Sequence, residues 1–235
     1  MEQFLFRKPM PFNRAFDWGG TNSRLYHKFI RSPNKVQKMK NSDQYEIGGL
    51  GLASTEYTVE QTGMDKNLRP EYEAVDVTGD TIFQCTYNMY EGKDTFPFVD
   101  DADDELFTVK ASGKLDIAGD YVLTEKQADE PLVVLDNDIS LMQDTWRIRD
   151  ADDGSLLAKI TSRGGLITLA RKLLPVGQFI GHKFEIADAD GNSVGAIESD
   201  LAVHDHYDIT ISDASSVPID PIVAAAVVID GIQGN

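Results

Sequence analysis

Residues 215–235 read SSVPIDPIVAAAVVIDGIQGN, and this closing stretch decides the fold. From Pro221 to Ile229 it contains no polar side chain, although the chain carries a net charge of −17. Three consecutive alanines favour a helix, and Pro221 suits a first helical turn. Ser215, Ser216 and Asp220 are candidate caps. The pattern predicts an α-helix from about Asp220 to Gln233.

The predicted helix is apolar on every face, so protein must surround it. At 1.5 Å per residue it would be about 21 Å long, which is short for a membrane span. We therefore expect an all-β fold, a closed antiparallel β-barrel of about twelve strands with the helix buried inside, although a membrane anchor remains an alternative. The predicted core residues of the helix are Pro221, Ile222, Val223, Val227, Val228, Ile229 and Ile232.

The body of the chain shows the short strands that such a barrel needs. Trp146 and Ile148 alternate with Arg147 and Arg149, as in a half-buried strand. Aspartate-rich and glycine-rich turns separate the strands and predict serial hairpins. The segment 166–177 is either a short amphipathic helix or a further strand. The predicted strands cover 56–62, 70–77, 81–90, 105–112, 120–126, 130–136, 144–150, 155–162, 182–188, 193–199 and 206–213.

Charge divides the chain into a basic beginning and an acidic body. Residues 1–40 carry a charge of +7 and residues 41–235 carry −24. We expect residues 1–43 to be a disordered extension, with two alternatives: a basic arm for a membrane or nucleic acid, or an upstream start site ahead of Met39. An acidic body repels polyanions, so we expect no nucleic-acid partner for the barrel. The acidity indicates adaptation to high salt; an ordinary acidic protein is the alternative.

Residues 1–10 have no apolar core of a signal peptide, so we expect a cytoplasmic protein. Cys85 is the single cysteine and lies among apolar neighbours, which predicts an inert buried thiol. The chain has no phosphate-binding, nucleophile-elbow or zinc-protease motif. The sequence therefore predicts a protein that is not an enzyme and has no cofactor.

Two patterns leave metal binding open. His204 and His206 would share one face of a strand, with His182 as a conceivable third ligand. The acidic turns near 150–154 and 188–198 resemble calcium loops, but their glycine and glutamate fall at the wrong positions for an EF-hand. We therefore interpret the turns as hairpins, and treat His204 and His206 as weak metal candidates.

The order of segments resembles a known family. The phrases DTWRIRDADDGSLLAKI and HKFEIADADGNSVGAI, then YDITI and the apolar helix, are similar to LURP-one-related proteins of the Tubby C-terminal-like and phospholipid-scramblase-like superfamily. The resemblance covers residues 44–235, and together with the acidity of the body it indicates a haloarchaeal member. It implies a twelve-stranded barrel around a hydrophobic helix. Tubby relatives bind phosphoinositides, but the scattered cations of this barrel form no clear cluster for such a head group.

Two functional hypotheses follow. The first is a non-enzymatic binding or scaffold module that acts at a membrane surface or with a protein partner. Its candidate contact is the apolar and basic stretch formed by Leu166, Leu169, Arg171, Lys172 and Leu173. The alternative is a metal-dependent enzyme or metal-binding protein that uses His204, His206 and the acidic loops.

Overall fold

The computed structural model describes residues 42–90, 93–112, 120–139, 144–163, 183–199 and 206–233. The chain divides into units 1–39 and 40–235, and all described residues belong to the second unit. The elements in chain order are η1 (Ser42–Tyr45), β1 (Glu56–Met64), β2 (Pro70–Asp76), β3 (Thr81–Thr86), β4 (Asn88–Tyr90), β5 (Lys93–Val99), β6 (Glu105–Ala111), β7 (Asp120–Glu125), β8 (Glu130–Ile139), β9 (Asp144–Asp150), β10 (Leu156–Ser162), β11 (Lys183–Asp188), β12 (Ser193–Ser199), β13 (His206–Ile211) and α2 (Ile219–Gln233).

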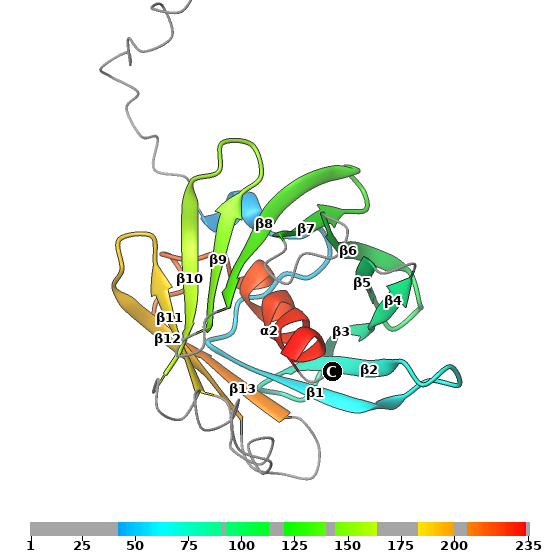
Figure 1. Cartoon of the computed structure of the whole chain (residues 1–235). Coiled ribbons are helices and arrows are strands. Elements are labelled where there is room, and N and C mark those ends of the chain that lie inside the picture. Colours follow the sequence, from blue (N-terminus) through cyan, green and yellow to red (C-terminus); the bar gives the residue numbers. More distant parts are fainter. Residues whose placement is uncertain are drawn as a thin grey trace, which may run out of the picture. The chain divides into compact units, whose positions relative to one another are not determined.

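The strands form one closed antiparallel ring. Consecutive strands are neighbours, β1 lies beside β13, and a pairing between β3 and β5 closes the ring. Strand β4 pairs with β5 alone, so twelve strands make the barrel (Figure 1). This confirms the fold predicted from the sequence. Closure satisfies the backbone groups that an open sheet would expose at its edges.

Strand β5 was not among the predicted strands, because it contains Pro97 and is followed directly by an acidic turn. Pro97 has no backbone N–H to donate to a neighbouring strand. Gln84 pairs with Val99, and Asn88 pairs with Thr95 in the same register, but the ladder is interrupted opposite Pro97. The predicted strand 81–90 is consequently divided into β3 and β4. Together these two strands form one arm of a hairpin whose other arm is β5.

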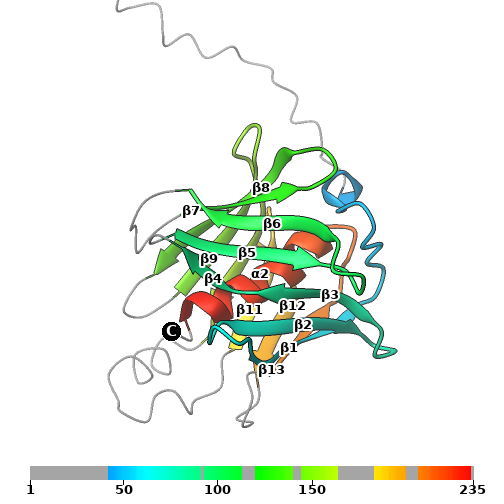
Figure 2. The ribbon, with the colours of Figure 1, turned by 90° about the vertical axis from the view of Figure 1, so that its right-hand side faces the viewer.

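Helix α2 fills the barrel, as predicted (Figure 2). Every residue from Asp220 to Gly231 is buried, and Ile232 is half-buried against the core. A helix with its side chains is about 10–12 Å wide, which suits the interior of a twelve-stranded ring. The alanines at 224–226 allow the large luminal side chains of the strands to approach the helix axis. Helix and strands therefore share a single hydrophobic core.

The luminal faces of the strands supply the rest of this core. Trp146 and Ile148 point inward and are fully buried, whereas Arg147 and Arg149 are only partly buried on the outer face, as the alternation predicts. Three phenylalanine rings contact one another with centroids 4.2–5.9 Å apart: Phe98 and Phe107 are stacked, and Phe83 meets both of them edge to face. Cys85 is also buried there, and burial raises the pKa of its thiol well above the usual value.

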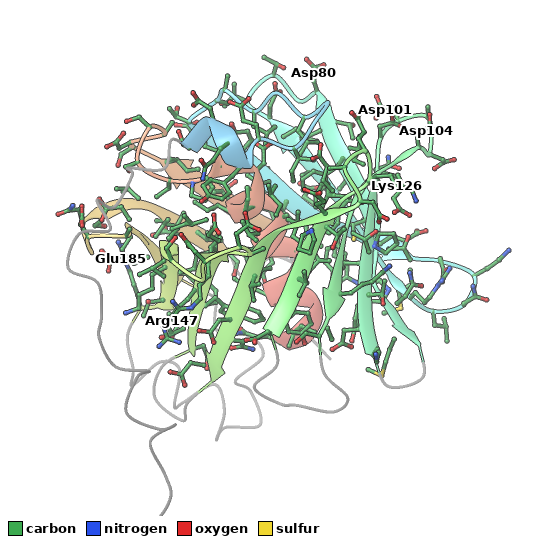
Figure 3. The ribbon with its side chains drawn as sticks, turned by 90° about the horizontal axis from the view of Figure 1, so that it is seen from above. Asp80, Asp101, Asp104, Lys126, Arg147 and Glu185 are labelled. Atoms are coloured by element: carbon green, nitrogen blue, oxygen red, sulfur yellow. The ribbon has the colours of Figure 1, made fainter. Side chains whose placement is uncertain are left out.

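The antiparallel order gives the barrel two ends of different composition. We call the end at which α2 begins the acidic end, and the end at which it finishes the opposite end. The acidic end carries nineteen acidic residues and one basic residue, Lys126, in the ranges 42–55, 76–80, 100–105, 125–130, 150–155, 188–192 and 212–220. Figure 3 shows Asp80, Asp101, Asp104 and Lys126 on this side of the barrel.

Candidate functional site

The acidic turns are hairpin turns with a shared geometry. In the turn that begins at Asp188, the side-chain Oδ1 accepts hydrogen bonds from the backbone N–H groups of Asp190 and Asn192, at 2.9 and 2.8 Å. Asp76 and Asp100 accept the same pair of bonds in their own turns. The first aspartate of each of these turns is therefore occupied by the backbone, which supports the hairpin interpretation.

The metal hypothesis finds only one of its two histidines among the described residues. His206 lies on the outer face of β13, where its ring nitrogens are 2.8 Å from Glu60 Oε1 and 3.1 Å from Asp208 Oδ1. Partial burial disfavours the charged ring, but the two carboxylates outweigh it and raise the pKa of His206 above its usual value. His204 lies outside the described residues. Within the described ranges, no group of three His, Cys, Asp or Glu residues could hold a metal ion.

The predicted contact stretch cannot be located in the barrel. Leu166, Leu169, Arg171, Lys172 and Leu173 lie outside the described residues, as does the basic extension up to residue 41. No helix in the described part of the chain has the length and apolar content needed to cross a bilayer. The candidate surface must therefore be sought in the described barrel itself.

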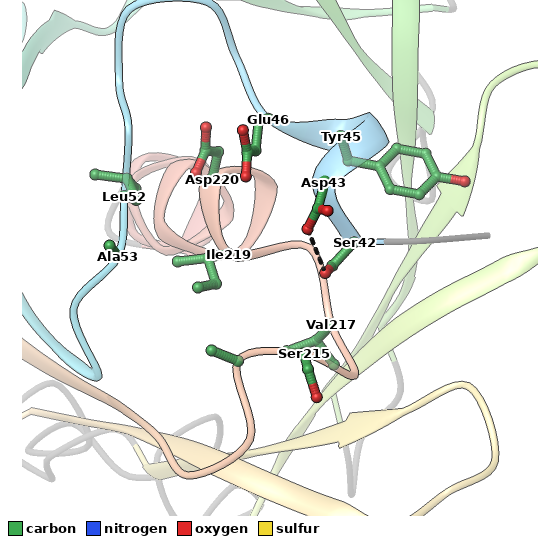
Figure 4. Close-up of a pocket in the computed structure, with 11 residues that line it drawn as sticks. Ser42, Asp43, Tyr45, Glu46, Leu52, Ala53, Ser215, Val217, Ile219 and Asp220 are labelled. Carbon is green, nitrogen blue, oxygen red and sulfur yellow. Dashed lines mark hydrogen bonds between the residues drawn. The ribbon is translucent and has the colours of Figure 1, made fainter. Parts of the chain in front are cut away.

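The acidic end is closed by the segment 42–53, which crosses the start of α2 (Figure 4). Tyr45 donates its hydroxyl to Asp150 Oδ2 at 2.6 Å, and the Gly48 N–H donates to Glu125 Oε1 at 3.0 Å. The Ile47 N–H donates to Asp220 Oδ2 at 2.7 Å. These three bonds tie the segment to β9, to β7 and to the helix.

A pocket of roughly 280 Å³ lies between this segment and the first turn of α2. Leu52, Val217 and Ile219 provide apolar walls, and Asp43, Glu46 and Asp220 are the acidic residues that line it. Desolvation and the charge of Glu46 raise the pKa of Asp220 to about 6, although the Ile47 N–H favours the ionised form. At the edge of the lining, the Ser42 hydroxyl donates to Asp43 Oδ1 at 3.4 Å.

Tyrosine–carboxylate pairs lie towards the opposite end. The hydroxyls of Tyr87 and Tyr121 donate to the two oxygens of Asp94, at 2.6 and 3.0 Å, and Tyr207 donates to Asp230 on the last turn of α2. Desolvation, together with the Asp94 carboxylate, raises the pKa of both Tyr87 and Tyr121. These hydrogen bonds join β5 to β7 and α2 to β13.

Three of the four large apolar side chains that are exposed among the described residues lie at the opposite end, and no pattern in the sequence pointed to them. Met64 and Leu68 belong to the β1–β2 hairpin, and Met89 lies in β4; their exposed fractions are 58%, 78% and 66%. The hairpin extends beyond the ring of strands (Figure 1). The Tyr87 N–H donates to the Pro70 carbonyl at 2.9 Å, which places β4 beside this hairpin.

A sequence signal for this site exists. Residues 65–69 read DKNLR and form a turn like DVTGD and DADGN, because Asp65 Oδ1 accepts from the N–H groups of Asn67 and Arg69. In those two sister turns, at 76–80 and 188–192, the fourth residue is a glycine. In the 65–69 turn the fourth residue is Leu68, which has a φ of 61°. A left-handed conformation costs an ordinary side chain about 1–2 kcal/mol. An exposed leucine at a glycine position is therefore the anomaly that could have been noticed.

Comparison with known proteins identifies a family. A family model described as LURP-one-related matches residues 81–230, which is 150 of the 235 residues. The matched region runs from β3 to the last turn of α2, and so includes most of the barrel and its central helix. No curated protein matches the chain.

Proposed function

Since the chain belongs to the LURP-one-related family, we propose that it is a non-enzymatic binding or scaffold module that engages a membrane surface or a protein partner. The filled lumen carries this proposal. Val223, Val227 and their neighbours on α2 occupy the space in which a barrel of this size would otherwise hold a ligand. Binding is thereby directed to the outer surface and to the ends of the barrel.

The positions of the buried carboxylates support a role without catalysis. Asp150 accepts the Tyr45 hydroxyl and two backbone N–H groups, and Asp220 accepts the Ile47 N–H. Asp230 accepts the Tyr207 hydroxyl. A general acid or base must be free to exchange a proton with a substrate, whereas these groups hold parts of the fold together.

The test is affinity capture of the full chain from a native cell extract, followed by mass spectrometry of bound proteins and lipids. We expect one protein or lipid class at a stoichiometric level, retained by His206→Ala and lost on substitution of Met64 and Leu68 by serine. Metal analysis of the purified protein is run in parallel. A stoichiometric metal that supports turnover and is lost in His204→Ala or His206→Ala would contradict the proposal and favour the metal-dependent alternative.

The proposal includes three predictions that were made from the sequence. These are the kinship with Tubby C-terminal-like proteins, the adaptation to high salt and the cytoplasmic location. The Asp-rich acidic end is the structural feature that supports the second of them.

A further inference from the structure

Leu68 occupies the least favourable kind of position for an exposed leucine. Its backbone has a φ of 61°, and the equivalent residues of the sister turns are Gly79, Asp103 and Gly191. The side chain is 78% exposed, and the turn is held by its backbone hydrogen bonds and by Asp65 rather than by packing of the leucine. Because the turn does not need the leucine side chain, its exposure is a reason to look for a contact outside the chain.

The hairpin that carries Leu68 and the adjoining β4 hold both apolar and basic residues. We call it the hairpin tip and define it as residues 64–70 of the β1–β2 hairpin with 88–90 of β4 and Lys93. Arg69 donates to Asn88, which joins the hairpin to β4. The apolar members are Met64, Leu68 and Met89, and the basic members are Lys66, Arg69 and Lys93. Asp65 is the acidic member, and Arg69 pairs with it.

The distribution of charge favours contact through this surface. The acidic end lies about one strand length away, and seven residues of a strand such as β2 span roughly 23 Å. The Debye length at physiological salt is about 8 Å, so the acidic end is screened from a surface that touches the hairpin tip. The acidic end itself would be repelled, which orients the barrel.

We propose that the hairpin tip docks on an anionic lipid surface, with Leu68, Met64 and Met89 entering the interface and Lys66 and Lys93 facing the head groups. This inference rests on the proposed binding function and names its surface and partner. Apolar side chains flanked by lysines on a protruding turn match the interfacial region of a bilayer. A protein partner would need a matching pocket for a convex tip, and becomes an outcome of the test.

The experiment is co-sedimentation of the full chain with phosphatidylcholine vesicles, with or without phosphatidylglycerol, at about 0.15 M salt, where the acidic end is screened. We expect wild type to sediment with the phosphatidylglycerol vesicles. Leu68→Gly/Met89→Ser should bind about tenfold more weakly, and Lys66→Glu should weaken binding to a similar degree. The matched control is Asp103→Gly/Val77→Ser, which changes the equivalent turn position and an exposed apolar residue at the acidic end, and should bind like wild type.

Leu68→Gly relieves the left-handed strain, so loss of binding cannot be attributed to unfolding if thermal denaturation shows an unchanged or higher midpoint. If the wild-type protein stays in the supernatant with both vesicle types, the lipid inference is wrong. Equal sedimentation of the two double variants overturns it as well. If vesicles are not bound but a protein is captured from extract through the hairpin tip, the lipid inference fails and the proposed binding function stands.

Discussion

Asp220 Oδ2 accepts a hydrogen bond from the Ile47 N–H at 2.7 Å, although 173 residues separate the two in sequence. The bond joins the first turn of the central helix to the segment that closes the acidic end of the barrel. Asp220 is 2% exposed, and its pKa is raised to about 6. A carboxylate in this position stabilises the fold better when it is protonated than when it is charged.

Asp220→Asn is therefore expected to stabilise the protein at pH 8. The folded-state pKa of Asp220 lies above the unfolded value of about 3.9, so its favourable contribution is complete below the unfolded pKa and is lost as pH rises through about 6. The free energy of unfolding should rise by about 1–3 kcal/mol at pH 8, with no difference from wild type near pH 3.5. Urea titrations at the two pH values measure it. A destabilised variant at pH 8 would show that the charge is needed to hold the Ile47 N–H.

The buried face of α2 should dominate stability. Ile222 has no exposed surface, and Ile222→Ala should lower the free energy of unfolding by about 2–5 kcal/mol because it leaves a cavity between helix and strands. Ile232→Ala, on the same helix but only partly buried, is the control and should cost less. Chemical denaturation of both variants tests this. Equal losses would mean that the helix is not held in the lumen through its N-terminal half.

The glycine of the acidic turns should be required by backbone geometry. Gly191 has a φ of 90°, where a Cβ is disfavoured, although no atom lies within 4 Å of it. Gly191→Ala should therefore cost about 1–2 kcal/mol through conformation alone. The preceding residue offers a control, since Asp190→Ala changes neither the turn conformation nor a hydrogen bond of its described side chain. Thermal denaturation that shows no difference between the two variants would contradict this account.

Salt should stabilise the barrel. Nineteen acidic residues share one end with a single lysine, and their mutual repulsion is screened as ionic strength rises. Raising KCl to about 1 M, where the Debye length is about 3 Å, should increase the free energy of unfolding by about 1 kcal/mol or more. Asp101→Asn/Asp152→Asn/Asp190→Asn should reduce this salt dependence. An unchanged dependence in the triple variant would locate the effect elsewhere.

The sequence by itself determined the architecture. The apolar run of α2 has no polar face, so it had to lie inside protein, and alternation in segments such as TWRIR assigned each strand its inner and outer residues. The acidic turns followed from the preference of Asp and Gly for hairpin conformations. These features depend on neighbours within a few residues, which is why the pattern alone was sufficient.

Tertiary structure alone decided where the chemistry lies. Pro97 made strand β5 hard to predict from the sequence. The strand is evident from its pairing with β3 on one side and β6 on the other. The bond between Ile47 and Asp220 joins residues far apart in sequence, and the bonds from Tyr87 to Pro70 and from Arg69 to Asn88 join β4 to the β1–β2 hairpin. Such contacts depend on barrel closure and strand register, which no local pattern contains. The candidate surface was therefore identified only from the folded chain.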